Sequence, residues 1–314
     1  MNEQVLIGID LGGTTTKMGL FSQNGELLNK WEIPTDISNN GRQIVPAIAN
    51  SIEAKLNELH IKKNQVIGVG VGAPGSVHVE TGFIFEAVNL GWKQFPLKAE
   101  LEKSLGFPAA IDNDANCAAL GEMWQGAGKG SKELVCVTLG TGVGGGIITN
   151  GQIVHGIKGA GGEIGHMTMV PENGLSCNCG KTGCLETVAS ATGIVRLARQ
   201  LLSDFTGETL LIKADLSAKD VFEAAENGDI LAKQVVEKVA FYLGLALSHL
   251  GNTLNPEKIV IGGGVSRAGN TLLEPVNQYF RSFTFPTVQE STSLRLATLG
   301  NEAGIYGAAW LAQG

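Results

Sequence analysis

Residues 5–21, VLIGIDLGGTTTKMGLF, contain two strand patterns separated by a turn of glycine and threonine. The apolar run from Val5 to Asp10 predicts a buried strand, and the glycine and threonine residues after it predict a turn into a returning strand at 16–21. Asn24-Gly25 then marks a hairpin turn, which leads into a third strand at 26–31. The chain therefore begins with an antiparallel sheet, and the first turn of this sheet exposes backbone N–H and hydroxyl groups.

The same order of elements recurs in the second half of the chain. A strand at 134–139, the turn Gly140-Thr-Gly-Val143, a strand at 144–148, Asn150-Gly151 and a strand at 152–155 follow one another. Each half later has an apolar strand that runs into glycine, at 66–71 and at 258–261. Two units of one plan predict a duplicated α/β fold, with an insertion in the longer second half.

Length and composition favour a globular protein of two domains. The chain has 314 residues, 43% of them hydrophobic and 17% charged, and one core usually stops growing at roughly 250–300 residues. We expect a first domain at 1–118 and a second at 119–300, with an amphipathic helix in 301–314 that packs back on the first. No segment approaches the roughly 20 apolar residues of a membrane span, and the net charge of −7 argues against a nucleic-acid partner.

Glycine is the compositional outlier, at 44 of 314 residues, about 14%, against a usual 7% or so. The two glycine–threonine turns can hold one polyphosphate through their backbone N–H groups. The candidates are Gly12, Gly13, Thr14 and Thr15 in the first turn and Gly140, Thr141, Gly142 and Gly144 in the second. Neither Gly-x-Gly-x-x-Gly match in the chain opens a helix, so a dinucleotide-binding fold is excluded.

Three further groups near these turns have two interpretations each. Asp10 ends the first strand and can hold Mg²⁺, or it can bind its own backbone in the turn. Lys17 can reach a phosphate, or it can be a solvated strand lysine. The run Gly262-Gly263-Gly264 can lie under an adenine and its ribose, or it can be a tight turn between a strand and a helix.

Three of the five cysteines lie within eight residues, at Cys177, Cys179 and Cys184, and His166 precedes them by eleven positions. Three thiolates and one imidazole complete a tetrahedral Zn²⁺ site, and a shell of four protein ligands is structural. The alternative is a disulfide with a free thiol, which the absence of an export signal disfavours. The other two, Cys117 and Cys136, stand in apolar surroundings and are expected to be inert buried thiols.

Asp112-Asn113-Asp114-Ala115-Asn116 follows a strand-like segment at 109–111 and opens a helical segment at 115–125. Clefts of α/β folds form at such junctions, so these side chains are candidates for chemistry. Asp and Asn are also favoured at helix N-caps, and a capping role alone would explain them.

Together these residues resemble the ROK family of sugar kinases, within the actin, Hsp70 and hexokinase superfamily. The resemblance rests on the segments 10–17 and 140–146, on Gly162-Glu-Ile-Gly-His166, and on the run from Cys177 to Glu186. It implies a two-domain, duplicated actin-like (ribonuclease H-like) α/β fold with a cleft between the lobes and a zinc-bearing insertion in the C-terminal lobe.

The resemblance, which is greatest to bacterial ATP-dependent glucokinases, also implies an activity. This activity is ATP- and Mg²⁺-dependent phosphorylation of the 6-hydroxyl of a hexose, with D-glucose foremost, in a cytoplasmic enzyme that feeds glycolysis and is commonly a homodimer. Asp114 is the implied general base, and the implied sugar ligands are Asn89, Asn113, Asp114, Glu163, His166 and Glu186. Zinc bound in this segment would hold Glu163 and Glu186 in place.

Several alternatives stay open at this point. The substrate can be another sugar, such as N-acetylmannosamine, N-acetylglucosamine or fructose, the donor can be polyphosphate, and a sugar-sensing regulator without catalysis uses the same fold. His166 is expected to bind metal with one nitrogen and can contact sugar with the other. The remaining histidines, His60, His78, His155 and His249, are expected to be solvent-facing or hydrogen-bonded structural residues.

Overall fold

The computed structural model describes residues 4–314, which divide into two compact units. Unit 1 contains the residues up to Gly130, the segment Ile153–Gly161 and the C-terminal segment Asn301–Gly314. Unit 2 contains Ser131–Gln152 and Gly162–Gly300. This division differs from the boundary expected after residue 118, because the helix that contains that position stays whole within unit 1.

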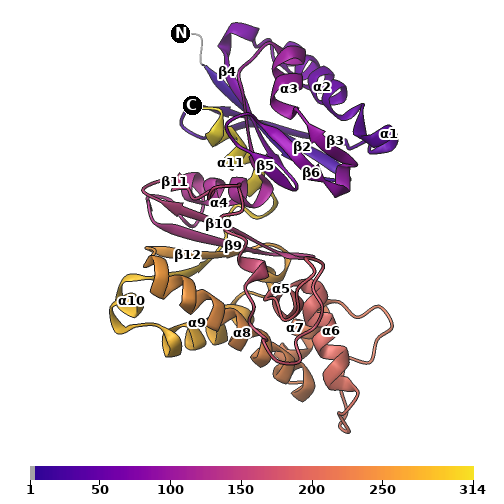
Figure 1. Ribbon diagram of the computed structural model, residues 1–314, viewed down its shortest axis with the longest axis vertical. Coiled ribbons are helices and arrows are strands. Elements are labelled where there is room, and N and C mark those ends of the chain that lie inside the picture. Colours follow the sequence, from indigo (N-terminus) through magenta and orange to yellow (C-terminus); the bar gives the residue numbers. More distant parts are fainter. Residues whose placement is uncertain (1–3) are drawn as a thin grey trace. The chain divides into compact units, whose positions relative to one another are not determined.

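Unit 1, whose strands are indigo to magenta in Figure 1, is built on a five-stranded sheet with the order β3-β2-β1-β4-β8. Strand β1 is antiparallel to β2 and parallel to β4, and β4 is parallel to β8. These strands are β1 (Val5–Leu11), β2 (Thr15–Ser22), β3 (Leu27–Pro34), β4 (Val66–Ala73) and β8 (Ala109–Asn113). A second, antiparallel sheet contains β5 (Ser76–His78), β6 (Phe83–Ala87) and β7 (Trp92–Phe95). The helices are α1 (Ser38–Gly41), α2 (Ile44–Glu58), α3 (Leu97–Leu105), α4 (Asp114–Gln125) and α11 (Ala303–Leu311).

Unit 2 repeats this plan with the strand order β11-β10-β9-β12-β13. Strand β9 is antiparallel to β10 and parallel to β12, and β12 is parallel to β13, as in unit 1. The strands are β9 (Leu134–Leu139), β10 (Val143–Thr149), β11 (Gln152–Ile153), β12 (Lys258–Gly262) and β13 (Ser293–Leu296). The helices are α5 (Glu186–Ala189), α6 (Ala191–Leu202), α7 (Ala218–Glu226), α8 (Ile230–Leu254), α9 (Asn270–Phe283) and α10 (Pro286–Ser291). The expected duplication is therefore confirmed.

Strand β1 is apolar up to Ile9 because both of its faces are covered. Ile7 and Ile9 pack in a core that includes Ile48 and Ile52 of α2, whereas Leu6 points to the other face and packs against Ile305 of α11. Successive side chains of a strand point to opposite faces, and strands buried on both faces read as continuous apolar runs. Only Asp10 interrupts the run, at the end of the strand where the site begins.

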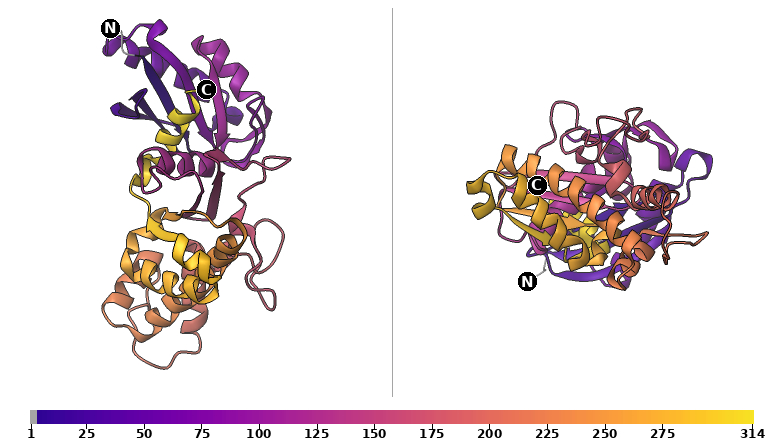
Figure 2. Two further views of the ribbon diagram at one scale, coloured as in Figure 1. Left: turned by 90° about the vertical axis from the view of Figure 1, so that its left-hand side faces the viewer. Right: turned by 90° about the horizontal axis from the view of Figure 1, so that it is seen from below.

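Helix α11 lies directly against the backbone of unit 1, as expected for the C-terminal helix (Figure 2). A Cβ added at Gly70 of β4 would lie 1.7 Å from the carbonyl oxygen of Ala308. One added at Gly307 would lie 1.7 Å from the carbonyl oxygen of Cys117 in α4. Cβ atoms added at Gly8 and Gly121 would lie 2.0 Å and 2.2 Å from carbonyl oxygens of α11. Part of the chain's excess of glycine therefore serves close packing of elements rather than ligand binding.

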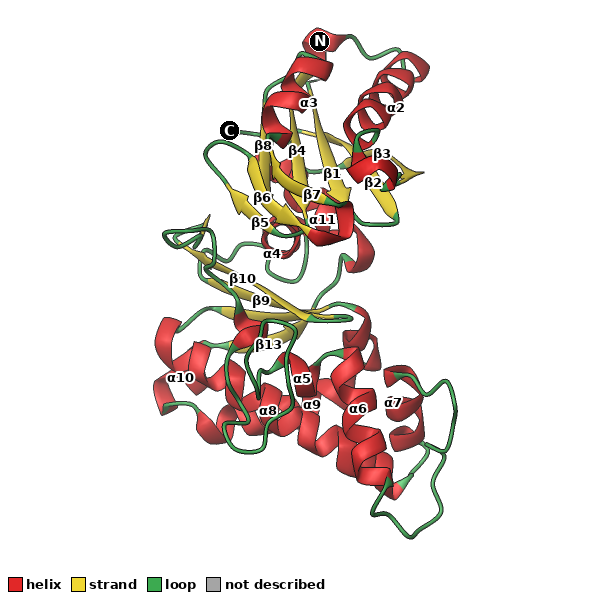
Figure 3. Ribbon diagram, turned by 45° about the vertical axis from the view of Figure 1, so that its right-hand side comes forward, coloured by secondary structure: helices red, strands yellow, loops and turns green. Residues whose placement is uncertain are grey.

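In unit 2, the helices gather on one face of the sheet and form the larger part of its core (Figure 3). Strands β9 and β12 contribute Val137 and Ile259, and α8 contributes Val235, Val239 and Leu243, all of them fully buried. A capping box formed by Ser217 and Asp220 begins α7. No helix within residues 4–314 combines the length and apolar character that a membrane span needs.

The contact between α11 and α4 generates a stability prediction. Gly307→Ala should lower the free energy of unfolding by about 3 kcal/mol or more, since overpacking costs roughly 1–3 kcal/mol and no rotamer can relieve a clash with a backbone oxygen. Gly140→Ala is the control, because nothing lies within 4 Å of its added Cβ. Chemical denaturation without ligands gives both values, and equal stability of the two variants would contradict the packing described here.

Candidate functional site

The first glycine turn joins β1 to β2, and hydrogen bonds to its carbonyl oxygens hold it in place. The Gly12 N–H donates to the Thr15 carbonyl oxygen across the turn (3.1 Å), and the Thr35 N–H donates to the Thr14 carbonyl oxygen (2.9 Å). The hydroxyls of Thr16 and Thr35 also hydrogen bond, at 2.8 Å. Gly12 therefore shapes the turn, and its N–H is already used within it.

Asp10 stands at the end of β1 beside this turn, with its side chain about one quarter exposed. Burial raises the pKa of its carboxyl group above the ordinary value, and the positive charge of Lys17 opposes that rise. The Lys17 ammonium lies 3.9 Å from the Asp10 carboxylate and 3.4 Å from the carbonyl oxygen of Asn301. A buried carboxylate with so little compensating charge suits a bound cation.

Asn89 is brought to the same turn from a distant part of unit 1. It lies in a short 3₁₀ helix, η2 (Val88–Leu90), between β6 and β7, and its side chain is exposed. A Cβ added at Gly13 would lie 3.3 Å from the Cβ of Asn89. A candidate sugar ligand and a candidate phosphate turn are therefore neighbours within unit 1.

The junction of β8 and α4 presents Asn113 and Asp114. The Asn113 side chain caps α4 by accepting the Ala115 N–H (2.9 Å), and its amide donates to the Gly75 carbonyl oxygen (3.1 Å). The capping interpretation of Asn113 is thus confirmed. Asp114 is the first residue of α4, its side chain is exposed, and its carboxylate accepts the Ala115 N–H at 2.8 Å.

The second glycine turn joins β9 to β10 in unit 2, and a separate segment, residues 186–192, holds it in place. The Glu186 carboxylate accepts the N–H of Val143 (3.0 Å). The Ala191 N–H donates to the Gly140 carbonyl oxygen (2.8 Å), and the Thr192 hydroxyl donates to the Thr141 carbonyl oxygen (2.9 Å). The N–H of Gly140 is used within the turn, on the Gly142 carbonyl oxygen.

The four predicted zinc ligands converge in unit 2. Their ligand atoms all lie within 4.8 Å of one another, and each of these cysteines is free. The Cys179 and Cys184 sulfurs are 3.6 Å apart, as are the Cys177 sulfur and Nδ1 of His166. Ligands at about 2.3 Å in a tetrahedron stand about 3.8 Å apart. The residues therefore fit a closed Cys₃His zinc site.

The two nitrogens of His166 face different groups. Nδ1 faces Cys177, whereas Nε2 lies 3.8 Å from the carboxylate of Glu163, which is exposed. One ring nitrogen is thus oriented for metal and the other toward a candidate sugar ligand, as the sequence allowed. Glu186 has a similar position, because its second carboxylate oxygen lies 3.6 Å from the Cys177 sulfur.

The third glycine run, Gly262–Gly264, borders a pocket of about 610 Å³ in unit 2. Gly263 has φ 82°, and an added Cβ there would meet the Leu139 carbonyl oxygen at 2.4 Å, so this position requires glycine. The pocket is lined by Gly264, Val265 and Arg267 together with residues of α7 that include Lys219, Phe222 and Glu223. Sequence reasoning missed the α7 residues, since neither the exposed Lys219 and Glu223 nor the buried Phe222 belongs to a motif.

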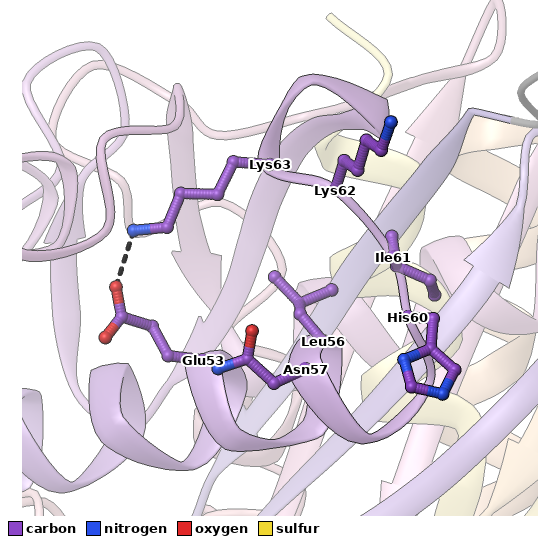
Figure 4. Close-up of a pocket in the computed structure, with 7 residues that line it drawn as sticks. All are labelled: Glu53, Leu56, Asn57, His60, Ile61, Lys62 and Lys63. Atoms are coloured by element: carbon purple, nitrogen blue, oxygen red, sulfur yellow. Dashed lines mark hydrogen bonds and ion pairs between the residues drawn. The ribbon is translucent and has the colours of Figure 1, made fainter.

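Another pocket, of about 570 Å³, lies at the end of α2 in unit 1 (Figure 4). Its lining includes Leu56, His60 and Lys62, and an ion pair of 2.5 Å joins its Lys63 to Glu53. None of the predicted site residues lines it. The exposed His60 beside it keeps its expected structural role.

The histidines and cysteines outside the metal cluster mostly match expectation. His78 and His249 are exposed, and Cys117 and Cys136 are buried. Burial raises the pKa of Cys117 well above the ordinary thiol value, which keeps this side chain unreactive. His155 is hydrogen-bonded, as expected for these histidines, and the partner of its ring is the buried Asp112 at 2.7 Å. The sequence gives no local signal for this pair, whose members are far apart along the chain.

Comparison with known proteins identifies the family. The model of the ROK family matches residues 6–314. The chain belongs to the ROK family. It is 52% identical to a glucokinase of Halalkalibacterium halodurans, over 99% of this chain and 96% of that one. It is 38% identical to a glucokinase of Thermotoga maritima, over 97% and 96% of the two chains. The crystal structure of a ROK family glucokinase from Streptomyces griseus in complex with glucose and AMPPNP matches with a TM-score of 0.80 and 34% identity, over 99% and 100% of the two chains.

The geometry of the metal cluster predicts what its loss does to this ROK protein. A Cys177→Ser, Cys179→Ser variant should bind no zinc, and amide hydrogen exchange should become at least about tenfold faster in residues 140–146 and 186–193. The reason is that the segment from Cys184 to Thr192 then loses its anchor and releases the second glycine turn.

Exchange mass spectrometry with metal analysis measures both effects. The first glycine turn, at residues 10–16, is the internal control and should not change. Zinc-free protein with unchanged exchange in both segments would contradict this link.

Proposed function

We propose that this protein is an ATP-dependent glucokinase, which transfers the γ-phosphoryl group of ATP to the 6-hydroxyl of D-glucose. The main support for this proposal is the 52% sequence identity to a glucokinase over nearly the whole chain. The glucose and AMPPNP bound to the related Streptomyces griseus enzyme agree with both substrates. The products are glucose 6-phosphate, which enters glycolysis, and ADP.

Asp114 is the proposed general base. Its carboxylate accepts the proton of the 6-hydroxyl while that oxygen forms a bond to the γ-phosphorus and the bond to the β-phosphate oxygen breaks. Two features support this role: the side chain is exposed, and its position is fixed by the first turn of α4. A base of this kind contributes roughly 10²–10⁴ in rate.

The remaining proposed sugar ligands are Asn89, Asn113, Glu163, His166 and Glu186. Carboxylates and amides are suited to the several hydroxyls of a hexose because each can accept more than one hydrogen bond. The zinc cluster would hold Glu163 and Glu186 through His166 and Cys184, which lie near them in the chain.

ATP is proposed to bind at the three glycine segments. The first turn contributes Gly13, Thr14 and Thr15 with Lys17 nearby, and the second contributes Thr141, Gly142 and Gly144. Gly12 and Gly140 shape these turns, and Gly262–Gly264 would border the adenosine in the 610 Å³ pocket, whose volume is typical of a ligand site. Asp10 would hold Mg²⁺, directly or through water, and the cation would neutralise charge on the phosphates.

We also infer a homodimer in the cytoplasm, with a sugar as the small-molecule partner. Cytoplasmic ATP is the donor that the reaction needs, and reduced thiols at Cys177, Cys179 and Cys184 agree with that compartment.

A substrate panel tests the choice of sugar. With ATP and Mg²⁺, kcat/KM should be highest for D-glucose and at least about tenfold lower for fructose, N-acetylglucosamine and N-acetylmannosamine, since fructose differs from glucose at C1 and C2 and the other two sugars carry a bulkier C2 substituent. Coupled measurement of ADP release gives these values, and omission of Mg²⁺ is the control that should abolish turnover. Preference for an N-acetylated sugar would overturn the glucose assignment, and sugar binding without any turnover would favour a regulator.

Asp114→Asn tests the base. The variant keeps the shape of the side chain but cannot accept the proton, so kcat should fall by about 10²–10⁴ while the affinity for AMPPNP changes by less than about twofold. Asp204→Ala, at an exposed position, is the control. Turnover of Asp114→Asn within about threefold of the unmodified enzyme would refute this assignment.

A further inference from the structure

Asp112 carries a buried carboxylate that receives three hydrogen bonds. Its residue is only 1% exposed. One oxygen accepts the N–H of Asn113 (2.7 Å) and the side-chain amide of Asn116 (2.8 Å), and the other accepts Nε2 of His155 (2.7 Å). A buried carboxylate is stable only when such partners satisfy it, so the three donors form one unit with it.

The first two donors flank the proposed base. Asn113 precedes Asp114, and the side chain of Asn116, which is itself buried, stands two residues after it in the first turn of α4. The Asp112 carboxylate therefore fixes the chain on both sides of Asp114. Rotation of this carboxylate would break hydrogen bonds on both sides of the base.

The third donor comes from a different part of unit 1. His155 lies in the segment 153–161, which follows the end of β11 at Ile153. This segment forms a loop, which is closed by a hydrogen bond from the Gly161 N–H to the His155 carbonyl oxygen (2.8 Å). The loop packs tightly on β5, since a Cβ added at Gly159 would lie 2.7 Å from the Val77 carbonyl oxygen. His155 is thus presented to Asp112 by an ordered loop.

The chemistry of Asp112 and His155 identifies the donor of the hydrogen bond between them. Asp112 can only accept as a carboxylate, so Nε2 of His155 must carry the proton, whether the ring is neutral or charged. The hydrogen bond to Asp112 raises the pKa of His155 above its ordinary value, which strengthens this arrangement. About one third of the His155 side chain remains exposed.

We propose that His155 is a positioning residue for phosphoryl transfer, acting through the Asp112 carboxylate to hold Asp114 in its reactive orientation. This inference rests on the proposed role of Asp114 as general base. His155 itself contacts neither substrate nor Asp114 in the proposal. Without it, one oxygen of a buried carboxylate loses its donor, and the carboxylate turns toward water and releases Asn113 or Asn116.

The consequence is mainly a loss of turnover. A displacement of about 1 Å at a reacting group can cost about 10²-fold in rate. His155→Ala should therefore lower kcat for glucose by about 10- to 100-fold, while the KM for ATP, whose binding groups lie elsewhere, stays within about twofold. His155→Gln retains an N–H donor of similar reach and should recover kcat to within about fivefold of the unmodified enzyme.

Steady-state kinetics of both variants test the proposal, with circular dichroism to confirm that each is folded and with His249→Ala, an exposed histidine of α8, as control. Normal kcat in folded His155→Ala would overturn it, and so would an equal loss in His155→Ala and His155→Gln. If only the alanine variant fails to fold, the glutamine variant decides, and failure of both to fold would make the pair a folding contact and overturn the positioning role. Persistent turnover in Asp114→Asn would instead overturn the role of Asp114 as general base, and an unmodified protein that does not phosphorylate glucose would overturn the proposed function itself.

Discussion

A backbone turn that binds phosphate must be held through groups that do not face the phosphate, and this constraint explains much of the site. In unit 1 the turn after β1 is held by the Thr35 N–H, which donates to the Thr14 carbonyl oxygen. In unit 2 the turn after β9 is held by the Ala191 N–H, the Thr192 hydroxyl and the Glu186 carboxylate. Preorganised donors of this kind stabilise developing charge without reorganising during the reaction.

Through Glu186, the metal cluster is linked to the second glycine turn as well as to the proposed sugar ligands. One of its oxygens accepts a hydrogen bond from the second glycine turn, and the other lies beside the Cys177 sulfur. The same short segment therefore includes or contacts a metal ligand, a proposed sugar ligand and the proposed phosphate-binding turn. Zinc bound there would act as a scaffold that holds several binding groups at once.

Much of the fold was predictable because local signals agree with tertiary structure. The apolar run before Asp10, the Asn24-Gly25 turn and the cysteine spacing each specify their structure within a few residues, and the sheets, hairpins and metal cluster follow the prediction. Two local predictions needed correction. The strand expected at 152–155 ends at Ile153, because the chain leaves its sheet to join unit 1, and the boundary expected after residue 118 would cut through α4.

What the sequence could not reveal depends on pairs that are distant along the chain. His155 meets Asp112, and Glu186 meets Val143, each across 43 positions. The pocket residues of α7 carry no motif, since Lys219 and Glu223 look like any exposed helix surface. Only the path of the chain brings such groups together, and so the sequence patterns predicted candidate ligands but not the residues that contact and support them.

The proposed reaction depends on Asp114, which would receive the proton of the glucose 6-hydroxyl. A crystal structure of the protein with glucose and AMPPNP tests this role most directly. If Asp114 is the general base, one of its carboxylate oxygens should lie about 2.6–3.2 Å from the 6-hydroxyl oxygen of glucose. The 6-hydroxyl oxygen should also point toward the γ-phosphorus. A bound glucose whose 6-hydroxyl contacts a different carboxylate, with Asp114 turned away from it, would contradict this role.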